Sequence, residues 1–379
     1  MKKYFYILVA LWIGSCVDPY RPPAVEAPNT YLVVDGFLNG SGASTIRLSR
    51  TQNLLEGQKP PVETKATIRV EGQTGGSQAF TDKGDGTYTL TEGNLQFGQS
   101  YRVRIRTANG REYLSDYVTI KRTPQIDSVT WYPGADGVQF EVTTHDPTNN
   151  TKYYRWEYEE TWEYYTAFYS VVDYVNKNFV YRSENINHCW RSNNSTGIFV
   201  SSSVKLTQDV INKYPLVYVS HVASNRLRVR YSLLVKQYAL TAEAYEYWEN
   251  LRKNTENLGS LFDPQPFQVL GNIRSVTDPN EPVVGYLSGY SVEEKRIFVA
   301  SSQLPPWRIP SGYESCVPDS LPLVATREKP SAFEMAELGY VPIDELRPPN
   351  GGPVLGYRMS SAFCVDCRTV GTNVKPSFW

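Results

Sequence analysis

The amino-acid sequence predicts a mainly β protein, with an N-terminal immunoglobulin-like sandwich followed by a second β-sandwich-like domain. Short segments rich in Val, Ile, Thr and Tyr alternate apolar and polar residues, as half-buried strands do. Turn-forming residues separate these segments at short intervals. Residues 241–258 have the apolar spacing of a helix, which we interpret as a helical insertion in the second domain.

The first residues are typical of an export signal. Two lysines precede an uncharged apolar run over residues 4–12, which is far shorter than a membrane-spanning helix. A branched residue and two small residues then lead directly into Cys16, an order that resembles a bacterial lipobox. We therefore predict a lipoprotein signal peptide over residues 1–15 and attachment of lipid to Cys16. The alternative is an ordinary secreted protein with an incidental cysteine.

A proline-rich tether over residues 16–29 is expected to hold the first domain away from the membrane. Residues 30–123 are predicted to form the immunoglobulin-like sandwich. Within them, Tyr101, Val103 and Ile105 alternate with arginines, as on a strand with one buried face. Asn109-Gly110 follows and predicts a tight hairpin turn.

The second domain is predicted over residues 124–379, and its most unusual stretch is the aromatic segment 153–181. Such a segment is either core and cross-strand packing in a Tyr-rich sheet or a contact surface for a glycan or protein. The candidate contact residues under the second interpretation are Trp156, Trp162, Tyr164 and Tyr165.

The predicted helix has recognisable ends. Thr241 can cap its first turn, Glu243 suits the positive end of the helix dipole, and Gly259 ends the stretch. After Pro305 the chain is expected to be mostly loop, held by cysteines.

Four cysteines remain once Cys16 carries lipid, namely Cys189, Cys316, Cys364 and Cys367. An even number in an exported chain predicts two disulfides, with three possible pairings. The Cys364-Val-Asp-Cys367 motif lies in a Gly-rich tail and lacks the strand-to-helix context of a redox site. Export to an oxidising compartment also favours disulfides over a zinc site.

Composition argues against several classes of function. Lys and Arg number 38 and Asp and Glu 39, so the chain lacks the basic excess of a nucleic-acid binder. Its three histidines have no metal-ligand spacing, and no nucleotide-binding or hydrolase motif occurs. We therefore expect no catalytic residue, metal or cofactor, with an enzyme as the least favoured hypothesis because catalytic groups need not be close in sequence.

Several stretches together resemble one family, the Bacteroidota lipoproteins known as domain of unknown function 4249. They are the segment from Ser15 to Tyr20, the segment from Gly259 to Pro266 that contains the Phe262-Asp-Pro loop and leads into Gly271-Asn-Ile, Val284-Gly-Tyr286, and the tail from Cys364 to Trp379. The resemblance implies an outer-membrane lipoprotein, anchored by lipid on the extracellular face and partnered with a TonB-dependent transporter. It supplies no catalytic residues.

The leading functional expectation is an accessory subunit that captures or gates the substrate of such a transporter, with a glycan or small molecule as the ligand. The alternative is a structural or assembly scaffold of an outer-membrane complex without a ligand of its own.

Overall fold

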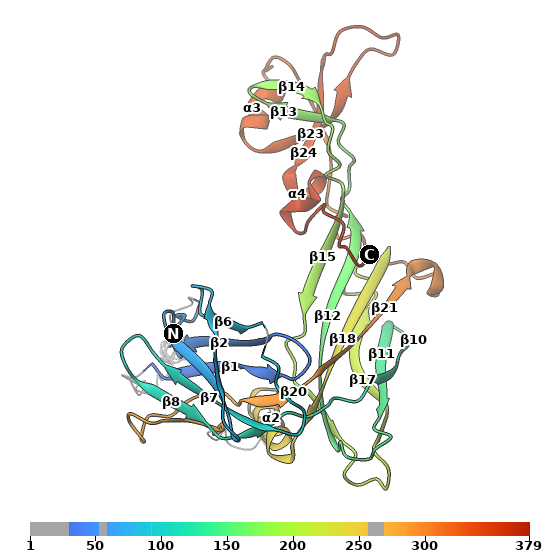
Figure 1. The fold of residues 1–379 in the computed structure, drawn as a ribbon. Coiled ribbons are helices and arrows are strands. Elements are labelled where there is room, and N and C mark those ends of the chain that lie inside the picture. The colour runs from blue at the N-terminus through green and yellow to red at the C-terminus, as the bar shows by residue number, and fades with distance from the viewer. Residues whose placement is uncertain (1–29, 53–58, 92, 257–268) are drawn as a thin grey trace, which may run out of the picture.

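The computed structural model describes residues 30–52, 59–91, 93–256 and 269–379. The protein is mainly β, as predicted, and has three parts (Figure 1). Two sandwiches lie side by side, and a smaller unit sits at the far end of the second sandwich. We call this unit, residues 166–187 and 315–370, the distal lobe.

The first sandwich packs two sheets face to face, with strand orders β20-β1-β2-β6-β5 and β19-β8-β7-β3-β4; β9 also pairs with β7. Val103 and Ile105 are buried while the intervening arginines lie outside, and the Asn109-Gly110 turn joins β7 to β8, as predicted. The strands are β1 (Leu32–Asn39), β2 (Ser44–Arg50), β3 (Thr67–Gly72), β4 (Ser77–Ala79), β5 (Thr81–Asp82), β6 (Thr87–Leu90), β7 (Ser100–Arg106), β8 (Glu112–Ser115), β9 (Val118–Thr119), β19 (Ile273–Ser275) and β20 (Ser288–Tyr290).

Two of these strands come from far along the chain, so the first sandwich is not the continuous segment 30–123 that we expected. β19 pairs antiparallel with β8, and β20 pairs parallel with β1. Each pairing involves only three residues, and such short edge strands leave no local pattern that a sequence-based boundary could use. The chain therefore leaves the first sandwich near residue 124 and returns to it after the helix.

The second sandwich places the sheet β10-β11-β17 against the sheet β15-β12-β18-β21, in which β16 also pairs with β12. Its core contains Phe140, Tyr154, Trp156, Tyr231 and Val235. The strands are β10 (Ile126–Pro133), β11 (Gly137–His145), β12 (Tyr153–Tyr165), β15 (His188–Asn194), β16 (Phe199–Ser202), β17 (Val210–Ser220), β18 (Arg230–Leu240) and β21 (Val292–Ala300), with η2 (Ser301–Gln303) after the last.

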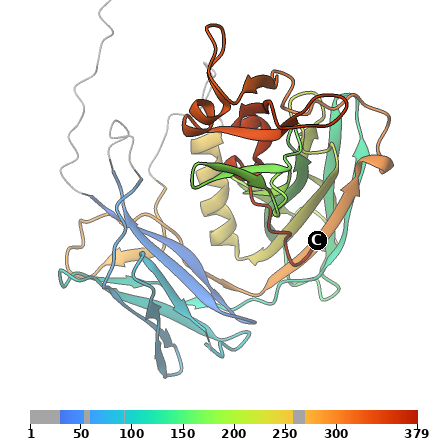
Figure 2. The ribbon, with the colours of Figure 1, turned by 90° about the horizontal axis from the view of Figure 1, so that it is seen from above.

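The predicted helix is α2 (Ala242–Glu256), which lies between the two sandwiches (Figure 2). The Ala244 amide donates to the Thr241 hydroxyl at 3.2 Å, which is the expected cap. Ala244 packs with Tyr238 of β18 and Tyr290 of β20, so one apolar cluster joins the helix to both sandwiches. The predicted end at Gly259 and the Phe262-Asp-Pro loop lie outside the described residues.

The distal lobe is more regular than the loop that we expected after Pro305. A three-stranded sheet, β22-β24-β23, packs beside the β13-β14 hairpin and two short helices. The elements are β13 (Val172–Val175), β14 (Asn178–Tyr181), β22 (Asp319–Pro322), α3 (Ala332–Glu337), β23 (Tyr340–Leu346), β24 (Gly356–Ser361), α4 (Ala362–Val365) and η3 (Cys367–Thr369). Prolines and glycines separate these elements, and each element is too short to show a clear apolar periodicity in the sequence.

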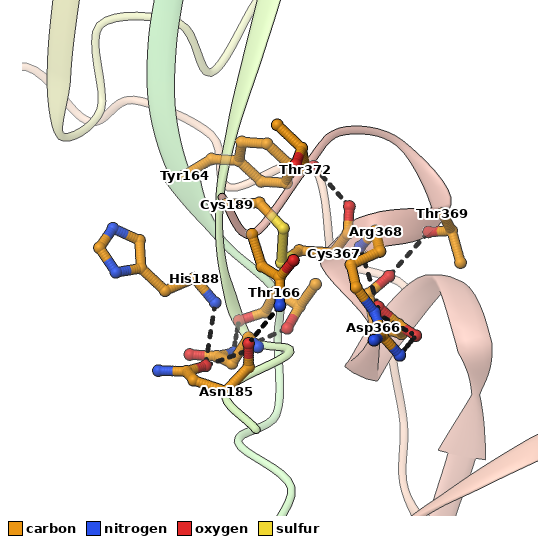
Figure 3. Close-up of a disulfide and its surroundings, with 12 residues drawn as sticks. Tyr164, Thr166, Asn185, His188, Cys189, Asp366, Cys367, Arg368, Thr369 and Thr372 are labelled. Carbon is orange, nitrogen blue, oxygen red and sulfur yellow. Dashed lines mark hydrogen bonds and ion pairs between the residues drawn. A yellow bond between two sulfur atoms is a disulfide. The ribbon is translucent and has the colours of Figure 1, made fainter. Parts of the chain in front are cut away.

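Two disulfides form, Cys189–Cys367 and Cys316–Cys364, so the C-x-x-C motif does not close on itself. The first joins β15 of the second sandwich to η3 of the distal lobe (Figure 3). Tyr164 reinforces this junction by donating to the Cys367 carbonyl at 2.6 Å. The disulfide links residues 178 positions apart in the sequence.

Among the described residues, no helix combines the length and apolar character needed to cross a membrane.

Candidate functional site

The aromatic residues predicted as contacts lie mostly inside the second sandwich. Trp156, Tyr164 and Trp162, the last 5% exposed, belong to its core. Tyr165 alone is exposed, at 45%, and stacks on His188 with ring centroids 4.4 Å apart. Because even-numbered residues of β12 face the core, the structure does not bring these four side chains together on one surface.

The remaining predicted site residues are the cysteines. Cys16 lies outside the described residues, and its lipid attachment stays a prediction. Cys189, Cys316, Cys364 and Cys367 all form disulfides. Within the ranges that the structure describes, no three His, Cys, Asp or Glu side chains gather closely enough to hold a metal ion.

A cleft of about 800 Å³ opens between the two sandwiches. One wall is β1 with β20, from the first sandwich. The opposite wall is the outer face of β12, β18 and β21, and α2 contributes Tyr247, Trp248 and Leu251. The odd-numbered residues of β12 that face away from the core, Arg155, Glu157 and Glu159, point into this space. The alternation that buries Trp156 therefore also builds the cleft.

Arg155 is the central buried cation of the cleft. Its guanidinium lies 3.9 Å from the ring centroid of Trp248 and forms an ion pair with Glu157. Burial alone would lower the pKa of Arg155, but the neighbouring Tyr290 and Glu157 outweigh it and raise that pKa. The guanidinium is thus held charged and in a fixed orientation by an aromatic face and a carboxylate.

Glu157 connects this cation to the neighbouring strand. The Tyr238 hydroxyl donates to Glu157 Oε2 at 2.7 Å. Burial, and then the Glu157 charge, raise the pKa of Tyr238 far above its ordinary value, so this hydroxyl remains a donor. The Glu157 side chain is still 38% exposed, which leaves carboxylate lone pairs open toward the cleft.

The floor of the cleft is aromatic and joins the two sandwiches. Phe37 of β1 stacks on Tyr290 with ring centroids 4.7 Å apart, and Tyr290 lies 5.0 Å from Tyr238 of β18. On the helix side, the Tyr247 and Tyr286 ring centroids are 5.0 Å apart. These contacts fix the relative position of the walls, so the polar groups above them are preorganised.

Ser288 stands out on the floor of the cleft. It is 7% exposed, and its hydroxyl has no hydrogen-bond partner among the described residues. Ser288 lies opposite Phe37 in the β1–β20 pairing and lines the cleft. A buried hydroxyl without a partner is unfavourable, so a group that enters the cleft and bonds to it gains free energy.

The family of the chain follows from its sequence. A family model described as Domain of unknown function (DUF4249) matches residues 17–296. The chain belongs to the DUF4249 family. The matched range includes both walls of the cleft and helix α2, and it ends inside β21. Most of the distal lobe, residues 315–370, therefore lies beyond the matched range of the DUF4249 model.

Two solved structures show a distant likeness to this DUF4249 protein. A putative carbohydrate binding protein from Bacteroides uniformis shares 7% identity over 56% of this chain and 91% of its own, with a TM-score of 0.14. The chitinase ChiA74 from Bacillus thuringiensis shares 11% identity over 50% of this chain and 28% of its own, with a TM-score of 0.15. Similarity this low supports no argument about function. No curated protein matches the sequence.

Sequence reasoning missed the residues that build the cleft of this DUF4249 protein. A signal for Arg155 and Glu157 was available, because they alternate with Trp156 and so must lie on the opposite face of β12. No comparable signal existed for Ser288, which comes to the cleft through a three-residue parallel pairing. Trp248 was recognisable as a helix residue, but nothing in the sequence indicated that its ring packs against the guanidinium of Arg155 on β12.

A second cavity, of about 760 Å³, lies where the chain passes from the first sandwich to the second. Lys121 donates to the Leu240 carbonyl at 3.1 Å, and burial lowers the pKa of this lysine. Asp127 pairs with His145 at 2.8 Å. Each of these polar groups already has a partner, so we place the candidate site in the first cleft, where the Ser288 hydroxyl has no partner among the described residues and the Glu157 carboxylate is partly exposed.

Proposed function

We propose that this protein is a surface-exposed outer-membrane lipoprotein that acts as the binding subunit of a TonB-dependent transporter. The observation that carries the proposal is the cleft between the sandwiches, with Arg155 and Glu157 fixed above an aromatic floor that includes Ser288. A preformed recess with a few converging polar groups is the usual form of a ligand site. Its role would be to capture the ligand or gate its entry.

The anchor and the partner rest on sequence. The lipobox-like segment before Cys16 and the proline-rich tether support attachment to the outer membrane, with the sandwiches held outside it. Resemblance to Bacteroidota lipoproteins supports a TonB-dependent transporter as partner. The chemistry available in the cleft is hydrogen bonding, ion pairing and stacking, and no His or Cys is among the described residues that line it.

A second candidate function, an assembly scaffold without its own ligand, is favoured by the surface of the distal lobe. Exposed apolar side chains of the kind found at protein interfaces gather on this lobe. Several of its charges, by contrast, pair within the lobe, as Asp173 does with Arg182 and Asp319 with Lys329. The exposed apolar residues are Tyr169, Val171, Val175, Val180, Tyr181, Val317, Val324, Phe333, Leu338, Tyr340, Leu355 and Phe363.

The test is purification of the C-terminally tagged lipoprotein from native outer membrane in a mild detergent, followed by mass spectrometry. The proposal predicts a TonB-dependent transporter in stoichiometric amount. Recovery with assembly machinery would instead favour the scaffold, and recovery of the lipoprotein alone would contradict both partner proposals.

A further inference from the structure

We infer that the cleft binds a neutral, hydroxyl-rich ligand, namely a segment of an oligosaccharide. This inference rests on the proposed capture function and specifies its substrate class. It follows from the arrangement of charges on the cleft wall, from the unpartnered Ser288 hydroxyl and from the pairing of the strands that line the cleft.

The charges on the wall form a row that crosses three strands. In the sheet register, Glu157 lies opposite Lys236, and Lys236 lies opposite Glu294. Opposite residues in antiparallel strands project from the same face, and neighbouring strands are about 4.8 Å apart. The cleft therefore presents an acceptor, a donor and an acceptor in line, which we call the polar ladder.

Each charge of the polar ladder already has a partner of opposite sign. Glu157 pairs with Arg155, and Lys236 lies 3.9 Å from Glu294. A strongly charged ligand would therefore meet a group of its own sign beside any group that attracts it, which disfavours its binding. A hydroxyl both donates and accepts, so successive sugar hydroxyls can bond to alternating carboxylates and ammonium groups without a net charge.

The aromatic residues and Ser288 fit the same ligand. Trp248 and Tyr286 are half-buried at the cleft, so part of each ring stays open to the polarised C–H groups of a sugar face. The buried Ser288 hydroxyl lacks a partner among the described residues, and a ligand hydroxyl can supply one.

An extended peptide is a poorer fit, because it binds mainly by adding a strand to an open sheet edge. β1 is flanked by β2 and β20, and β12 by β18 on one side and by β15 and β16 on the other. The outer edge of β20 is also occupied, since the Lys121 amide donates to the Gly289 carbonyl at 3.0 Å. Of the strands that line the cleft, β1, β12, β18 and β20 thus offer a peptide no free backbone edge, and β21 is the one that ends its sheet.

The test uses the full-length lipoprotein in detergent on a broad glycan array, followed by calorimetric titration of the neutral oligosaccharides that bind. A polygalacturonate and a tryptic peptide mixture serve as the acidic and peptide probes. We expect saturable binding of at least one neutral oligosaccharide. Absence of any neutral binder, or binding of only the acidic or peptide probe, would overturn the inference.

Variants connect the binding to the cleft. Ser288→Ala is expected to weaken the affinity about tenfold without lowering the melting temperature, because it removes a hydroxyl that is unpaired in the free protein. Lys236→Gln is expected to weaken it by a similar factor. The matched control is Glu345→Gln in the distal lobe, where Glu345 pairs with Arg347. Equal affinity for all three variants and the wild type would also overturn the inference.

This outcome is independent of the transporter experiment. If the transporter co-purifies but no neutral oligosaccharide binds, the proposed partner stands and the substrate class fails. If an oligosaccharide binds in the cleft but no transporter co-purifies, the substrate class stands and the proposed partner fails.

Discussion

Trp162 and Tyr165 lie on the same strand, β12, but face opposite environments. Trp162 is in the core of the second sandwich, and Tyr165 projects outward against His188. Trp162→Ala is therefore expected to lower the free energy of unfolding by about 3–5 kcal/mol, because it leaves a cavity. Denaturant unfolding provides the measurement. Tyr165→Ala, the matched control, is expected to lower the free energy of unfolding by less than about 1 kcal/mol. An equal loss of stability in the two variants would contradict the conclusion that Trp162 faces the core and Tyr165 faces outward.

Glu71 provides a pH-dependent test in the first sandwich. It accepts hydrogen bonds from Arg104 and Arg102, each at 2.8 Å. The bond from Arg104 is the main reason that the pKa of Glu71 lies below its usual value of 4.5, although burial opposes it. An acid with a lowered pKa in the folded state stabilises the fold above its unfolded pKa, and this contribution is lost as pH falls through the folded value.

We therefore expect Glu71→Gln to reduce the free energy of unfolding by about 1 kcal/mol at pH 7. The difference from the wild type should shrink below pH 4.5. Urea unfolding of both proteins between pH 7 and pH 3 measures it. A difference that grows as the pH falls would contradict the assigned role of this carboxylate.

Helix α2 forms one side of the cleft, and its first turn depends on Thr241. Thr241→Ala removes the cap and is expected to destabilise the helix by about 0.5–2 kcal/mol. Hydrogen exchange of the α2 amides reports this directly. Thr255→Ala, near the other end of the helix, is the control and should leave exchange in the first turn unchanged. Equal protection of the first-turn amides in Thr241→Ala and in the wild type would contradict the capping role of Thr241.

The Cys189–Cys367 disulfide tests how the distal lobe is held. Replacing both cysteines by Ala removes a link between residues 178 positions apart, and such a loss typically costs about 2–5 kcal/mol. We expect faster hydrogen exchange in β15 and η3, with exchange in β1 and β2 of the first sandwich unchanged. Faster exchange in both regions would show instead that the disulfide stabilises the whole chain.

Some elements were predictable from local pattern, and others were not. The capped helix and the alternation of Val103 and Ile105 with polar residues follow from residue spacing within short segments. The structure confirms both. The β1–β20 pairing and the disulfide partners depend on contacts between distant segments, which one sequence does not encode locally. The cleft combines both cases: the positions of Arg155 and Glu157 follow from the alternation along β12, whereas the position of Ser288 depends on the pairing of distant strands.

The lipid anchor is a prediction that rests on the sequence of the first residues. Cys16→Ser is expected to move the protein from the membrane fraction to the soluble fraction, because no diacylglycerol can be attached. Fractionation of cells followed by immunoblotting measures this change. Ser15→Ala keeps a small residue before the cysteine and should leave the protein in the membrane, and unchanged fractionation of Cys16→Ser would contradict lipid anchoring.

The proposals place two tasks in different regions, with ligand capture proposed for the cleft and partner contact proposed for the apolar surface of the distal lobe. This division separates the capture function from the scaffold function experimentally. A scaffold needs only the folded molecule at the membrane, whereas capture also needs the polar ladder.

The most direct test is therefore the uptake rate of the tightest-binding oligosaccharide in cells that carry Lys236→Gln with Ser288→Ala, at surface levels equal to the wild type. Capture predicts slower uptake at low oligosaccharide concentration and wild-type uptake at saturation, since only the affinity is changed. Uptake equal to the wild type at every concentration, in cells where deletion of the whole protein abolishes uptake, would contradict capture and assign the molecule a scaffold role.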